Sequence, residues 1–265
     1  MKSNQIARSL EDEADDAGEW NLGICATGAR NGAVALDVWK RMEQKLEIGR
    51  FGLPEGTYHQ CKVKLAERPL AERGKELDDP GLEETIWIER LSPCHGIVRS
   101  VLYGKLGADY GDVILFDGAP ITHHIYGDTK VPVFPHLTTL VRQNYQFHDF
   151  AGTQQEPRQL ADVSRDLDGD AVVYPHSENV QLFCANCWRD PSLDHEHRER
   201  VEKHVVTGRI AAAPHVDPVQ LLAQLDKAVA KRSGCQLYAP GLCAAAGFEP
   251  RASVEKHRFD LLTRN

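Results

Sequence analysis

The stretch SPCHGIVRSVLYGKLGADYGDVILFDGAPITHHIYGD, residues 92–128, decides the fold that the sequence predicts. Ser92 and Pro93 are typical of a helix start, since a capping hydroxyl precedes a proline in the first turn and apolar residues follow. Two runs rich in β-branched residues come next, at 112–116 and 120–126, on either side of an Asp-Gly turn. The pattern predicts a helix followed by a β-hairpin, and therefore an α+β fold.

The sequence on either side of this stretch predicts three regions. Residues 1–88 contain an acidic tail, an amphipathic helix at 32–48, and an alternating strand at 58–65 that is followed by a charged connector. Residues 89–150 form the predicted core, with the helix and hairpin described above. Residues 151–265 form a C-terminal region rich in cysteine and histidine.

Composition narrows the class of protein. The chain has 265 residues, 42% of them hydrophobic, and a net charge of -8. It can bury a core, but extended nucleic-acid binding is disfavoured because phosphate backbones require basic surfaces. No apolar run reaches the ~20 residues of a membrane helix, and the acidic N-terminus does not resemble a signal peptide. The seven cysteines are an odd number, which favours a reducing compartment. We therefore expect a cytoplasmic protein with no membrane partner.

Cys94 is the first candidate for chemistry. It lies near the start of the predicted helix, where unpaired backbone N–H groups and the helix dipole stabilise a thiolate. A thiol hydrolase also needs a base and a polar group that orients the base. His123 and His124 lie on the second predicted strand, and Asp128 and His136 follow as candidate orienting residues.

These residues resemble those of the NlpC/P60 cysteine peptidases. The motifs Pro-Cys-His-Gly at 93–96, Gly-Asp-Val-Ile-Leu-Phe at 111–116 and Ile-Thr-His-His-Ile-Tyr at 121–126 follow the order of that family's motifs. The resemblance implies a papain-like core of helix and antiparallel sheet. It also implies that Cys94 is the nucleophile, His123 the base and His136 the orienting residue of a hydrolase or acyltransferase. The substrate would be a peptide or another amide, and no cofactor would be required.

Strand alternation favours His123 over His124 as the base. The side chains of Ile121, His123 and Ile125 share one face of the predicted strand, and this apolar face is expected to pack against the helix that begins near Cys94. His124 lies on the more polar face. The alternative is that Cys94 is a buried core cysteine and that both histidines are ordinary sheet residues.

A second cluster has the residue types of a zinc site. Cys184 and Cys187 form a Cys-x-x-Cys pair, and His195 and His197 follow. These two histidines would complete a tetrahedral site if residues 195–204 do not form a straight helix. Thiolates and imidazoles are the ligands that zinc prefers. We expect at most one structural Zn²⁺ here. The alternative is a pair of reduced core cysteines beside a solvated helix face.

Two other functions remain open. Asn179 followed by the Cys-x-x-Cys pair resembles the end of HNH nucleases, and that resemblance would make His123 and His124 the upstream metal-binding pair of a zinc-dependent nuclease. Trp188 stands where that family usually has a metal-binding histidine. The third possibility is a non-catalytic, zinc-stabilised interaction protein. The oligomeric state is not predicted.

Overall fold

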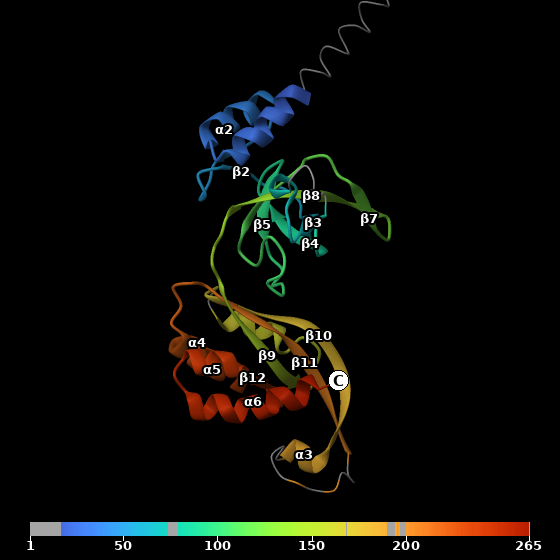
Figure 1. Cartoon of the computed structure of the whole chain (residues 1–265), viewed down its shortest axis with the longest axis vertical. Helices are drawn as coiled ribbons and strands as arrows, with labels where there is room; N and C mark the ends of the chain where they lie inside the picture. The colour runs from blue at the N-terminus through green and yellow to red at the C-terminus, as the bar shows by residue number, and fades with distance from the viewer. Residues whose placement is uncertain are drawn as a thin grey trace, which may run out of the picture. The chain divides into compact units, whose positions relative to one another are not determined.

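The computed structural model of the chain describes residues 17–73, 79–167, 169–189, 194, 196 and 200–264. The chain divides into two compact units (Figure 1). The division falls between Gln143 and Asn144. Both helices and sheets are present, so the α+β class is confirmed. The boundaries predicted after residues 88 and 150 fall inside strands β4 (Glu83–Arg90) and β9 (Gln146–Gln154), and two units replace the three predicted regions.

The N-terminal unit is built on a five-stranded β-barrel. Its strands are β3 (Cys61–Ala66), β4, β5 (His95–Val98), β6 (Val113–Phe116) and β8 (Thr129–Val141), hydrogen-bonded in that order. Parallel pairing of β3 with β8 closes the ring. Strand β7 (Thr122–Tyr126) stands outside the ring and pairs with β8 alone, as one arm of a hairpin whose turn is Gly127-Asp128.

Two helices cover one part of the barrel. Residues 17–28 are helical, and α2 (Gly32–Arg41) follows after Asn31, whose side chain accepts a hydrogen bond from the N–H of Val34. Trp39 of α2 is fully buried and packs with apolar barrel residues such as Leu115. The amphipathic helix predicted at 32–48 is therefore confirmed in its first part. The short elements β1 (Glu47–Ile48), β2 (Pro54–Glu55) and η1 (Leu70–Glu72) lead into and out of β3.

The prediction of a helix that begins at Ser92 and Pro93 is wrong. Residues 92–94 form a bend, β5 follows, and no helix occurs between residues 89 and 150, all of which are described. The Ser92 hydroxyl does accept backbone N–H groups, as in a helix cap, but it does so in the tight connection between β4 and β5. β5 is buried on both faces, and a short continuous apolar run is compatible with a buried helix or a buried strand. A papain-like core requires that helix, so the predicted papain-like core is not confirmed.

The C-terminal unit is a four-stranded antiparallel sheet with helices. The strand order is β10 (Ala171–Cys184), β11 (Arg200–Ala212), β9 and β12 (Gln236–Tyr238). The helices are η2 (Ala161–Asp166), α3 (Ala185–Arg189), α4 (Pro218–Ala230), α5 (Pro240–Ala245) and α6 (Glu249–Thr263). The core joins sheet residues such as Phe150 and Ile210 to Leu221 and Leu225 of α4 and Leu242 of α5.

Within the described part of the chain, no helix has the length and apolar character needed to cross a membrane.

Candidate functional site

Cys94 lies in the apolar layer between the N-terminal helices and the barrel. Its side chain is fully buried and packs among residues that include Ala35 and Leu115. Burial raises the pKa of the Cys94 thiol to about 12, although interactions with the hydroxyls of Thr27 and Ser92 oppose the shift. The group is therefore a protonated thiol at neutral pH, enclosed by packed side chains.

The three residues of the expected catalytic site occupy different environments. His123 is exposed on β7, outside the barrel ring, whereas His136 is buried on β8 opposite Phe116. Burial lowers the pKa of His136 to about 4. Among the hydrogen bonds of the described residues, none joins Cys94 to either histidine. The structure thus brings neither of the two expected histidines to the thiol of Cys94.

His95 is the histidine that sequence reasoning overlooked in this region. Its ring Nδ1 is hydrogen-bonded to the Ser92 hydroxyl, whose oxygen also lies 4.0 Å from the sulfur of Cys94. Ser92, Cys94 and His95 are each fully buried, and burial lowers the pKa of His95 to about 4. These contacts fix the connection between β4 and β5 and leave no exposed reactive group.

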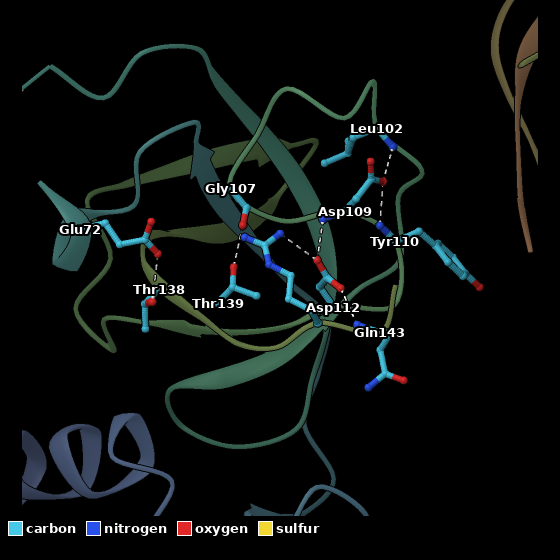
Figure 2. Close-up of polar contacts among 10 residues, drawn as sticks. Glu72, Leu102, Gly107, Asp109, Tyr110, Asp112, Thr138, Thr139 and Gln143 are labelled. Atoms are coloured by element: carbon cyan, nitrogen blue, oxygen red, sulfur yellow. Dashed lines mark hydrogen bonds and ion pairs between the residues drawn. The ribbon is translucent and has the colours of Figure 1, made fainter. Parts of the chain in front are cut away.

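The Gly-Asp motif before β6 organises a loop. The carboxylate of Asp112 accepts the backbone N–H groups of Gln143, at 2.8 Å, and Asp109, at 3.1 Å (Figure 2). Arg142 lies 3.4 Å from the same carboxylate, and the Asp109 carboxylate in turn accepts the N–H of Leu102. Burial raises the pKa of Asp112, against the effect of these hydrogen bonds. The cluster pins residues 102–112 to the end of β8.

Cys184 and Cys187 lie together at the end of β10 and in α3. The two thiols share a hydrogen bond, and partial burial together with that bond raises the pKa of Cys187. His195 and His197, the other expected zinc ligands, lie outside the described residues. Among the residues that are described, no group of three or more metal-binding side chains is found.

A cavity of about 400 Å³ lies beside α3. The ammonium group of Lys203 lies 4.7 Å from the ring centroid of Trp188 at this cavity. The complete lining is Thr153, Gln154, Gln155, Trp188, Glu202, Lys203, His204, Gly234 and Gln236.

A lysine-aromatic cluster that no sequence pattern indicates lies on the outer wall of the barrel and consists of Lys62, Trp87, His124 and Tyr126. Lys62 of β3 is only 7% exposed, and its Nζ lies 5.0 Å from the ring centroid of Trp87 and 4.9 Å from that of Tyr126. The same ammonium is hydrogen-bonded to the Tyr126 hydroxyl and lies 3.3 Å from Nδ1 of His124. The cluster therefore fastens the β7 hairpin to strands β3 and β4.

The outer edge of β7 is unpaired in the described part of the chain. Tyr126 and Thr129 flank the two-residue turn as a hydrogen-bonded pair, and such pairs alternate along an antiparallel ladder. His123, opposite Pro132, and Ile125 are consequently non-hydrogen-bonded within the hairpin, and their backbone N–H and C=O groups point outward. No described residue forms a hydrogen bond with these outward backbone groups.

β7 also lacks the features that protect an edge strand. Edge strands are normally blocked by charged residues, proline, bulges or short length. β10 contains Pro175 and Glu178 with a register shift after Pro175, and β12 has three residues. The β7 sequence, THHIY, contains no proline and no Asp, Glu, Lys or Arg, and its Ile125 is 69% exposed. β7 is therefore the open edge of the six-stranded sheet in the described part of the chain.

Comparison with known proteins assigns the chain to no family, because no protein-family model, no curated protein and no solved structure matches it.

Proposed function

We propose that the chain is a non-catalytic interaction protein that receives an extended segment of another polypeptide along the free edge of β7. The observation that carries the proposal is an unprotected edge strand whose hairpin is fastened to the barrel by Lys62. In strand addition, main-chain hydrogen bonds supply affinity and alternate side chains supply specificity. A hairpin held in place loses little conformational entropy on binding, which favours association.

The exposed side chains beside this edge suit a partly apolar partner. Ile121 and Ile125 are 54% and 69% exposed, and Tyr126 on the other face is 48% exposed. Isolated exposed apolar residues are common, but here three of them lie along one unpaired strand and its approach. A partner strand that alternates apolar and small polar residues would cover them.

The Cys94 hydrolase is the competing proposal, and three observations weigh against it. The thiol is buried, its pKa is raised to about 12, and His123 and His136 are not hydrogen-bonded to it. A reactive cysteine needs a stabilised thiolate and access to substrate.

The HNH nuclease is also disfavoured by the described residues. Neighbouring side chains of a strand point to opposite faces, so His123 and His124 of β7 do not converge on one ion. In addition, the ammonium of Lys62 lies 3.3 Å from Nδ1 of His124, where a cation would be repelled.

We propose one structural zinc ion for the C-terminal unit. Cys184 and Cys187 fit this role, because their thiols are close enough to share a hydrogen bond and lie on both sides of the junction between β10 and α3. Zinc bound by two thiolates would cross-link this junction. Residues 195 and 197 would complete the ligand set in the proposal.

The strand-addition proposal is tested with a synthetic peptide of alternating threonine and valine, acetylated and amidated, added in large excess to dilute protein. We expect amide hydrogen exchange at His123 and Ile125 to slow, because these N–H groups gain acceptors. Ile125→Lys should abolish the effect, since it places a charge on the edge. The matched control is Val254→Lys on α6, where the side chain is 67% exposed. Unchanged exchange in the wild-type protein would refute the proposal.

The zinc proposal is tested by metal analysis after purification without chelator. We expect one zinc per chain in the wild-type protein, and its loss in Cys184→Ser and Cys187→Ser. Cys235→Ser serves as the control, since Cys235 is also half-buried but lies outside the pair. A wild-type protein that contains no zinc would refute this part of the proposal.

A further inference from the structure

We infer that the segment received by β7 is β7 of a second copy of this chain, and that the two strands pair antiparallel about a two-fold axis at His124. This inference rests on the proposed function, because it names the partner of the same edge. Most soluble oligomers are symmetric homo-oligomers, and a two-fold interface requires a surface that is complementary to itself. An antiparallel pair of identical strands meets that requirement.

The positions of the outward backbone groups select one register. His123 and Ile125 carry the free N–H and C=O groups, and two residues separate them in sequence. When His124 faces the partner's His124, His123 lies opposite the partner's Ile125, and this pair exchanges two hydrogen bonds. Symmetry repeats the pair, so every outward group of both residues is satisfied. If the axis passed through His123 instead, His123 would pair with the partner's His123, and the outward backbone groups of Ile125 would not pair with those of His123. An axis through Ile125 would leave the outward groups of His123 without this pairing in the same way.

The side chains are compatible with this register. On one face, His123 lies beside the partner's Ile125, which covers the most exposed large hydrophobic side chain of the described residues. On the other face, Thr122 lies beside the partner's Tyr126. On the axis the two His124 rings face each other, each beside the Lys62 ammonium of its own copy. β7 itself contains no Asp, Glu, Lys or Arg.

Charge is also compatible with self-association through this region. The whole chain has a net charge of -8, so two copies repel each other in general. Residues 120–130 contain one acidic residue, Asp128, and one basic residue, Lys130, which cancel. The hairpin is therefore a neutral, partly apolar surface on an acidic protein.

The first experiment measures the oligomeric state by sedimentation velocity over a range of concentrations. We expect a reversible dimer for the wild type, and at least about a tenfold higher dissociation constant for Ile125→Lys. Val254→Lys, with a side chain of similar exposure, should dimerise like the wild type. A wild-type protein that stays monomeric up to its highest soluble concentration overturns the inference, as does an Ile125→Lys protein that dimerises normally.

The second experiment tests the register by cross-linking in a Cys25→Ser background, which removes the exposed native thiol. His124→Cys should form an intermolecular disulfide with glutathione disulfide as oxidant, because its two copies face each other across the axis. Ile125→Cys is the control, since its own copies are out of register. Faster cross-linking of Ile125→Cys than of His124→Cys overturns the inference.

The two proposals can fail separately. A monomeric wild-type protein whose β7 amides are protected by the threonine-valine peptide refutes the homodimer and supports strand addition. A monomeric protein with no protection refutes both.

Discussion

The Nζ atom of Lys62 lies 3.3 Å from Nδ1 of His124, which joins the barrel wall to a hairpin 62 residues further along the chain. Because Lys62 also contacts the rings of Trp87 and Tyr126, we expect Lys62→Ala to loosen the hairpin. The loss of cation–π contacts and hydrogen bonds should lower the free energy of unfolding by about 1–3 kcal/mol. Amide exchange at His124 should accelerate by about tenfold or more.

The control for this substitution is Lys64→Ala on the same strand. Lys64 forms a partly exposed ion pair with Glu83, and exposed pairs contribute about 0–1 kcal/mol. Equal effects of the two substitutions, measured by urea denaturation and by exchange, would show that the Lys62 cluster does not hold the hairpin.

Alkylation distinguishes a core cysteine from a nucleophile at position 94. Because Cys94 is fully buried and its pKa is raised to about 12, we expect iodoacetamide at pH 8 to leave it unmodified in the folded protein. Cys25 is exposed and should react. Cys94→Ala should lower the free energy of unfolding by about 1–2 kcal/mol, as for other small deletions in a packed core, while Cys25→Ala has little effect. Peptide mass spectrometry that finds Cys94 modified as fast as Cys25 would revive the hydrolase.

Acid should destabilise the N-terminal unit through two buried histidines. Burial lowers the pKa values of His95 and His136 to about 4, below the value of about 6.5 expected in the unfolded chain. The unfolded state therefore binds more protons between these values, and stability is full above about pH 6.5 and falls as the pH drops towards 4. Between pH 7 and pH 5 the loss should be on the order of 1–2 kcal/mol per histidine.

Urea denaturation of variants at both pH values checks this expectation. His136→Leu should reduce the difference in stability between pH 7 and pH 5. His59→Leu, at an exposed position of the same unit, should leave the difference unchanged. A pH dependence that is the same in His136→Leu and in the wild type would contradict the assignment.

The sequence predicted the local elements of the fold better than their assembly. The hairpin at 112–126 was predicted as two strands, and strands β6 and β7 are present, but they pair with β8 and not with each other. The closing contact of the barrel is the parallel pairing of Lys62 with Val133, between segments far apart in sequence. No local pattern specifies such a pairing, because it depends on how the whole sheet curves.

The contrast between local and long-range contacts also explains which parts of the candidate sites the sequence predicts. Cys184 and Cys187 are neighbours in sequence, and the structure places their thiols together. Lys62 and Tyr126 are 64 residues apart, and their contact follows from the hairpin turning back over β3. The alternation of Cys61, Lys62 and Val63 indicates which side of β3 faces the core, but it does not show what covers the other side.

Replacing either of two glycines by alanine should change the free energy of unfolding, in opposite directions for the two positions. Alanine normally stabilises a helix relative to glycine by about 0.5–1 kcal/mol. At Gly32, the first residue of α2, an added Cβ would lie 1.9 Å from the carbonyl oxygen of Gly52, so backbone must move. We expect Gly32→Ala to lower the free energy of unfolding by about 1–3 kcal/mol. At Gly241 in α5, an added Cβ meets no atom within 4 Å, so Gly241→Ala should raise the stability of the C-terminal unit. Calorimetry of both variants checks the pair, and a stabilising Gly32→Ala would show that α2 does not pack against the Gly52 loop.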